Sequence, residues 1–169
     1  NGRQLQSFPG VASTAAFRND IIVRGGGPSE NRFFLDGVEI PNINHFSTQG
    51  ASGGPVGIIN PDFIREVNFY AAAFPAARGN ALSSVLDFKL QDGNQEKSSA
   101  RAVVGASEVA FSSNNPLEKK TTYLVSVRRS YLQFLFKAIG LPFLPTYTDA
   151  QFKIKHQIDK QNEISFIGL

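Results

Sequence analysis

The sequence contains no cysteine, no methionine and no tryptophan, and it has only two histidines, His45 and His156. Without cysteine the chain can form no disulfide, no thiolate nucleophile and no cysteine-ligated metal site. Neither histidine has partners at the spacing of a metal site, so the sequence predicts no bound metal and no cofactor. Because there is no initiator methionine, we expect a processed or excised piece of a longer protein.

Long apolar runs and basic blocks are also missing. The most apolar stretch, 132–144, is interrupted by Gly140 and Pro142 and is shorter than the roughly 20 apolar residues that a membrane-spanning helix needs. The net charge is only +3 and the lysines and arginines are spread along all 169 residues, so we expect no nucleic-acid partner. No Ser-His-Asp set or carboxylate pair with a defined spacing emerges, and the sequence does not predict an enzyme.

The most distinctive stretch is VRGGGPSENRFFLDGVEI, residues 23–40. Its consecutive glycines and Pro28 predict a loop shaped by its backbone, between a strand that ends at Arg24 and a second strand over 32–40. A phosphate-binding loop would need a lysine followed by a serine or threonine at the opening of a helix, whereas here Pro28, Ser29 and Glu30 follow the glycines, with no lysine, and a strand comes next. A turn between strands is therefore favoured, and Asp36 is expected to have a structural role in an Asx-type turn.

Other elements of the first half are short. Helices are predicted over 12–17 and from Asn60 to about residue 66, where Asn60 can cap the helix and Pro61 suits its first position. Segments 67–70 and 85–90 are strand-like. The connection 42–59 is long, polar and rich in glycine, which is typical of functional or mobile loops.

The second half alternates between apolar and polar residues. Over 147–158, Phe152 and Ile154 lie on one side and Lys153 and Lys155 on the other. Strands are predicted at about 98–105, 108–117, 120–131, 147–158 and from 163 onward, so that the chain stops inside its fifth strand. This alternation fits the strands of a membrane β-barrel, and it fits equally a soluble antiparallel sheet with one wet face.

Three segments, in this order, resemble the plug domain of TonB-dependent outer-membrane receptors: VRGGGPSENRFFLDGVEI (23–40), NPDFIREVNFY (60–70) and FPAARGNALSSVLDFKLQDGN (74–94). The segment KKTTYLVSVRRSYL (119–132) is similar to an early barrel hairpin of the Bacteroidetes-type forms. The sequence departs from the family at 77–80, where the expected aromatic is missing, and no TonB box is recognisable.

The resemblance implies an α+β plug domain, a small mixed sheet with short helices, over 1–93. It further implies antiparallel β-strands of a truncated outer-membrane β-barrel over 94–169. The function implied is transport in the bacterial outer membrane: the protein binds a scarce nutrient, such as a siderophore or glycan, and gates its energised uptake through the plug. The partners implied are TonB, through a segment not present in this chain, a small nutrient ligand, outer-membrane lipid and, as a further candidate, a surface lipoprotein.

The alternative is a soluble cell-envelope binding or enzymatic domain with an antiparallel β-sheet. The two hypotheses differ in one face of the second half. A sandwich would cover this apolar face with protein, whereas a barrel would expose it; its residues are Tyr123, Val125, Val127, Phe152 and Ile154.

The resemblance also implies two sets of site residues. Substrate contacts are expected at Arg24, Asn42, Ile43, Asn44, His45, Phe46 and Phe63, where polar side chains beside an aromatic suit a sugar or chelate. The alternatives are an internal salt bridge for the arginine, a solvated loop for 42–46 and a core position for the phenylalanine at 63. Contacts between plug and barrel are expected at Arg24, Arg78 and Arg128.

Overall fold

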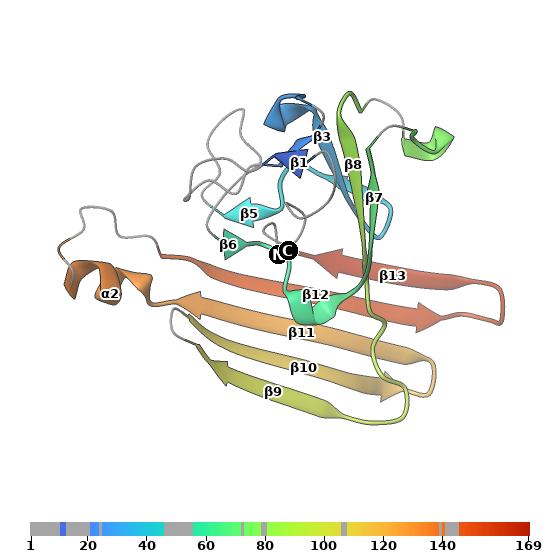
Figure 1. Ribbon diagram of the computed structural model, residues 1–169. Coiled ribbons are helices and arrows are strands. Elements are labelled where there is room, and N and C mark those ends of the chain that lie inside the picture. The colour runs from blue at the N-terminus through green and yellow to red at the C-terminus, as the bar shows by residue number, and fades with distance from the viewer. Residues whose placement is uncertain are drawn as a thin grey trace. The chain divides into compact units, whose positions relative to one another are not determined.

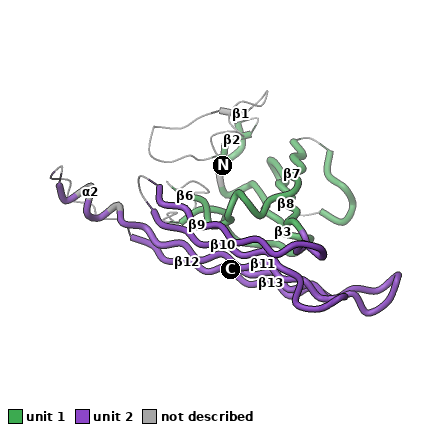
Figure 2. Tube along the Cα trace, turned by 90° about the horizontal axis from the view of Figure 1, so that it is seen from below, with its two compact units in different colours: residues 1–91 green, residues 92–169 purple. Residues whose placement is uncertain are grey.

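The computed structural model describes residues 11–12, 21–23, 25–45, 56–71, 73–78, 81–105, 108–138, 140 and 146–169. The chain divides into two compact units, residues 1–91 and residues 92–169 (Figure 2). The boundary predicted from the sequence, after residue 93, lies two residues further along the chain. Within the described residues no helix is both long enough and apolar enough to cross a membrane.

Unit 1 is built around a four-stranded sheet in the order β4-β3-β8-β7 (Figure 1). Its strands are β3 (Asn31–Leu35), β4 (Val38–Ile40), β7 (Ile64–Tyr70) and β8 (Ser84–Leu90). The central strands β3 and β8 run parallel, and the outer pairs are antiparallel, so the sheet is mixed as predicted. The central strands supply much of the core, with Phe33, Leu35, Val85, Leu86 and Phe88 all buried.

Smaller elements surround this sheet. Two short ribbons pair β1 (Val11–Ala12) with β2 (Ile22–Val23) and β5 (Asn44–His45) with β6 (Val56–Gly57). The helical elements of unit 1 in the described part of the chain are single 3₁₀ turns: η1 (Pro28–Glu30), η2 (Pro61–Phe63) and η3 (Ala76–Arg78). Apart from Ala12, which belongs to β1, the helix predicted over 12–17 lies outside the described residues.

The prediction of one continuous strand over 32–40 is wrong. The chain reverses at Asp36 and Gly37, whose φ angles of 47° and 90° place both in the left-handed region. The turn is tied to the central strand, because the Asp36 amide donates to the Phe88 carbonyl at 2.8 Å and its carboxylate Oδ1 accepts from the Leu90 amide at 3.0 Å. Asp36 is therefore structural as predicted, but its partners lie far along the chain.

The glycine loop also joins different partners from those expected. Its flanking strands β2 and β3 do not form a hairpin with each other: β2 pairs with β1, and β3 pairs with β4 and β8. The loop therefore connects a peripheral ribbon to the central sheet.

The helix predicted from Asn60 to about residue 66 is a single turn. Its predicted cap is confirmed, because the Asn60 side chain accepts from the Asp62 amide at 3.0 Å. The helix ends at Phe63 since the chain then enters β7, where its backbone groups pair with β8. Long-range strand pairing replaces further helical turns here.

Unit 2 is a five-stranded antiparallel sheet in which each strand pairs with the next along the chain. The strands are β9 (Ser99–Val104), β10 (Glu108–Glu118), β11 (Thr121–Ser130), β12 (Thr148–Gln157) and β13 (Glu163–Gly168). This confirms the predicted strands. The helix α2 (Leu132–Ala138), between β11 and β12, was not predicted.

The central strands of unit 2 alternate between a covered, mostly polar side, on which Leu124 is an apolar exception, and an exposed, mostly apolar side. On β11, Ser126 and Arg128 are buried, whereas Val127 between them is 43% exposed. On β12, Lys153 is 6% exposed and its neighbours Phe152 and Ile154 are 42% and 36% exposed. This polarity is the reverse of that of a soluble protein, whose apolar side chains face inward.

We predict that Gly37→Ala destabilises the protein by about 1–2 kcal/mol, since an L side chain is strained at a left-handed φ. The matched control is Gly27→Ala, because Gly27 has a φ of −66° and a Cβ there would meet Glu30 Oε1 at an ordinary 3.6 Å. Urea titration of the full-length protein measures both free energies of unfolding. Equal effects of the two substitutions would contradict the assigned turn.

Candidate functional site

The loop after β4 carries most of the predicted substrate contacts. The Asn42 side chain accepts from the backbone amides of Ile43 and Asn44, at 2.7 and 3.2 Å, which fixes the entry into β5. Ile43 and Asn44 are buried, at 7% and 6% exposure, whereas Asn42 and His45 are half-buried. Asn42 and His45 are thus the described members of this set whose side chains are partly open to ligand. Phe46 lies outside the described residues.

The remaining predicted substrate contacts are Phe63 and Arg24. Phe63 ends η2 and is 5% exposed, so its side chain belongs to the core of unit 1. Arg24 lies outside the described residues. Their roles in binding stay predictions.

Arg78, a predicted contact with the barrel, has partners within unit 1. Its guanidinium donates to Asp87 at 3.0 Å and lies 4.5 Å from the centre of the Phe34 ring. The Asp87 carboxylate is almost buried on β8, so the arginine balances its charge. The sequence analysis missed Asp87, although a single acidic residue inside the apolar run VLDFKL is a usable signal for a buried ion pair.

The glycine loop is packed tightly against the start of the central strands. The Gly26 amide donates to the Val23 carbonyl at 2.9 Å, and the Ser83 hydroxyl donates to the same carbonyl at 2.7 Å. A Cβ on Gly26 would collide with the side chains of Ser83 and Glu30. Close approach therefore accounts for glycine at this position.

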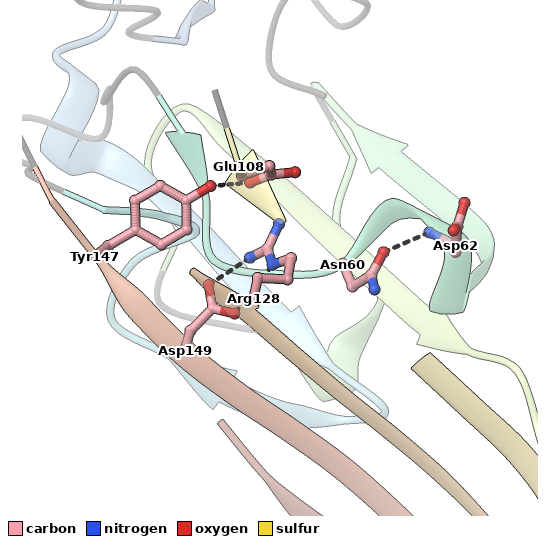
Figure 3. Close-up of polar contacts among 6 residues, drawn as sticks. All are labelled: Asn60, Asp62, Glu108, Arg128, Tyr147 and Asp149. Carbon is pink, nitrogen blue, oxygen red and sulfur yellow. Dashed lines mark hydrogen bonds and ion pairs between the residues drawn. The ribbon is translucent and has the colours of Figure 1, made fainter. Parts of the chain in front are cut away.

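A buried polar cluster lies in unit 2, where β11 and β12 pair Arg128 with Asp149. The guanidinium makes two hydrogen bonds to the carboxylate, at 3.0 and 2.6 Å, and both side chains are more than nine-tenths buried. Figure 3 shows this pair together with Tyr147, whose hydroxyl donates to the Glu108 carboxylate. Burial and the Glu108 carboxylate raise the pKa of Tyr147 well above its usual range, so the hydroxyl stays protonated.

Arg128, the other predicted plug–barrel contact, thus has a carboxylate partner within unit 2. Its pairing with Asp149 joins positions 21 residues apart, on two strands separated by α2 and the connection around it. No signal in the sequence specifies this pair, because the register of β11 against β12 is set by the whole sheet.

A second polar cluster fixes the connecting segment, residues 92–94, by which the chain enters unit 2. Asp92 lies between Lys153 and Lys155 of β12, with one oxygen 2.9 Å from each ammonium. Gly93 lies so close to Thr122 of β11 that a Cβ would collide with it. The Asn94 amide donates to the Asn114 side chain of β10 at 2.6 Å.

The connecting segment therefore crosses three neighbouring strands in succession, with one residue fixed on each. Burial alone would raise the pKa of Asp92, but the hydrogen bonds and charges of Lys155 and Lys153 outweigh it and lower that pKa below its ordinary value. The carboxylate is consequently charged under all physiological conditions, as an ionic anchor requires.

A metal-binding constellation does not emerge in the part of the chain that the structure describes. No group of three or more histidine, aspartate or glutamate side chains there is placed to hold a metal ion. The arrangement can bind and position groups, and its charged clusters are suited to holding segments of the chain together.

We predict that Asp92→Asn lowers the thermal midpoint at neutral pH and that this difference shrinks in acid. Because the folded pKa of Asp92 is lowered, the stability it contributes is present above its unfolded pKa of about 3.9 and is lost as the pH falls through the folded pKa. Thermal unfolding of the full-length protein between pH 7 and pH 3 measures the difference, with Glu118→Gln as an exposed carboxylate control. A constant difference across this range would contradict the ionic anchor.

No protein-family model and no curated protein matches the chain. Among four solved chains that match, one is a mutant of the ferric enterobactin receptor from Pseudomonas aeruginosa, with a TM-score of 0.63 and 16% sequence identity. The match covers 98% of this chain and 29% of that receptor chain, so the chain spans less than a third of its length. The likeness supports a fold like that of part of a TonB-dependent receptor.

Proposed function

We propose that this chain is part of a TonB-dependent transporter of the bacterial outer membrane. In this proposal unit 1 is the plug and unit 2 contributes the first strands of the surrounding β-barrel. The plug obstructs the pore, its loops help to bind a scarce nutrient such as a siderophore or glycan, and TonB acts through a segment not present here. Assignment to the Bacteroidetes-type forms, and a surface lipoprotein as a further partner, belong to the same proposal.

The observation that carries the proposal is the exposed apolar side of unit 2. Of the residues that distinguish a barrel from a soluble sandwich, Val127, Phe152 and Ile154 are at least 36% exposed, and Tyr123 and Val125 are half-buried. Exposing several large apolar side chains on one side of a sheet in water is unfavourable, at about 25 cal/mol for each Å². Contact with lipid removes that cost.

The polar side of the same strands also supports the proposal, because its charged groups are paired. A barrel interior is polar, and charged groups there must be paired or hydrated. The Arg128–Asp149 pair and the lysines around Asp92 meet this requirement on the side opposite Phe152. The connections β10–β11 and β12–β13 are short and β11–β12 is a long segment with α2, while the β9–β10 connection, 105–107, is also short. Short periplasmic turns and longer outer loops are typical of such barrels.

We predict that the full-length protein fractionates with the outer membrane and migrates differently on gels before and after heating. Recovery as a soluble periplasmic protein would contradict the proposal.

The proposal also predicts a difference between the two sides of β12. Phe152→Arg places a charge on the lipid side, where it costs about 2–4 kcal/mol near the middle of the bilayer. We expect it to reduce the heat-modifiable, membrane-inserted fraction strongly. The control, Gln157→Arg, adds the same charge at an exposed position on the polar side of the same strand and should leave that fraction nearly unchanged. Equal tolerance of both substitutions would contradict the lipid-facing assignment.

A further inference from the structure

Two connections of unit 1, the glycine loop before β3 and the connection from β7 to β8, meet at one end of its sheet. The parallel strands β3 and β8 both begin at this end, and the antiparallel strand β7 finishes there. The glycine loop before β3, the residues after β7 and the residues before β8 are therefore brought together. Between them lies a cavity of about 440 Å³ whose lining includes Val23, Gly26, Glu30, Phe74, Leu82 and Ser83. This volume lies within the range of about 300–1,000 Å³ that is typical of small-molecule sites.

The cavity contains one charged group among its described lining residues, the carboxylate of Glu30. This residue ends η1 and is half-buried. Its two oxygens lie over the glycine loop, where Cβ atoms on Gly26 and Gly27 would be 2.6 Å from Oε2 and 3.6 Å from Oε1. Gly26 thus makes room for the carboxylate at the cavity wall because it has no side chain, whereas a Cβ on Gly27 would be in ordinary contact with it.

The neighbouring polar groups are committed to the protein itself. The Ser83 hydroxyl donates to the Val23 carbonyl, and the Gly26 amide donates to the same carbonyl. By contrast, the Glu30 carboxylate makes no hydrogen bond or ion pair within the described residues. A carboxylate accepts hydrogen bonds only, so its natural complement is a group with several donors and a positive charge.

Apolar side chains complete the wall. Leu82 is 82% exposed and lies two residues before the start of β8, while Phe74 is half-buried. An exposed leucine and a phenylalanine beside a carboxylate provide an apolar surface that a ligand could cover while its donor group reaches the charge. No lysine, arginine or histidine belongs to the described lining, so nothing described there would attract an anion.

We propose that this cavity binds a small cationic ligand, in which a protonated amine or guanidinium meets Glu30 and an apolar or ring portion packs on Phe74 and Leu82. Binding of such a ligand follows from the lining of the cavity. That this ligand is the transported nutrient rests on the proposed transport function. The cavity selects by charge, favouring cations over neutral analogues of the same shape and rejecting anions.

The test uses three probes with one aromatic body: phenethylammonium, 2-phenylethanol and 3-phenylpropionate. Each is titrated against the full-length protein in a zwitterionic detergent, with empty micelles subtracted and the Leu82 methyl signals followed by NMR. We expect the ammonium to bind about two- to fivefold more tightly than the alcohol, as one partly exposed ion pair allows, and the carboxylate to bind most weakly. Equal binding of all three, or tightest binding of the anion, would overturn the proposal.

Two variants locate the charge responsible. Glu30→Gln keeps the shape of the side chain and should reduce the preference for the ammonium over the alcohol to about onefold. The matched control Glu66→Gln removes an exposed carboxylate near the opposite end of β7 and should leave the preference unchanged. An unchanged preference in Glu30→Gln would contradict the role of Glu30.

A measurement on the unmodified protein keeps the proposal testable if Glu30→Gln fails to fold. Raising the salt from 50 to 500 mM should weaken binding of the ammonium severalfold and leave the alcohol unaffected, because salt screens an exposed ion pair. Salt-independent binding of the ammonium would count against the proposal. Outer-membrane fractionation, measured separately, tests the transport function. A protein that fractionates with the outer membrane but shows no preference for the ammonium would contradict the cation site and leave the transport proposal standing.

Discussion

The opposite polarity of the two sides of unit 2 is the constraint on which the rest of that unit depends. Large apolar side chains such as Phe152 are exposed on one side, and Lys153 and Arg128 are buried on the other. A charge that leaves water needs a close partner of opposite sign, because its desolvation otherwise costs several kcal/mol. Each buried basic group accordingly has one, in Asp92 or Asp149. The exposed apolar side and the ion-paired polar side of the sheet thus have the same cause, a polarity opposite to that of a soluble protein.

A different constraint organises unit 1, where parallel pairing of β3 and β8 requires a long crossover between them. That crossover contains the β5–β6 ribbon, η2, β7 and η3. Most of the described residues of unit 1 therefore belong to the connection that brings the chain back to pair with β3. Because parallel strands begin at the same end, the loops before them meet there. The glycine loop is tightly packed for this reason, and the cavity beside Glu30 arises from the same geometry.

Local patterns predicted much of this architecture. The strands of unit 2 followed from alternation with a period of two, which is a property of each strand by itself. The Asn60 cap was also predicted, since its partner lies only two residues away. The hairpin at Asp36 and Gly37 was missed although an Asp-Gly pair between apolar residues is a strong hairpin signal, and here the interpretation of the sequence failed.

Other features could not be predicted because they depend on contacts between distant residues. The helix after Asn60 stops at Phe63 because β8 supplies strand partners, and Arg128 meets Asp149 only through the register of two long strands. The Glu30 cavity likewise forms from two connections, the glycine loop and the β7–β8 connection, which lie about 40 positions apart in the sequence. The pattern of residues within a short segment carries no information on contacts with distant segments.

The way the chain leaves β8 has a mechanical consequence. β8 is a central strand of its sheet, and only Gln91, whose amide is bonded to the Phe63 carbonyl, separates its last residue from the anchored Asp92. The C-terminal end of β8 therefore has almost no freedom to move away from Asp92. Among the described elements, tension applied from the N-terminal side would reach the β1–β2 ribbon first, whose strands have two residues each, while the end of β8 is held by the Asp92 ion pairs.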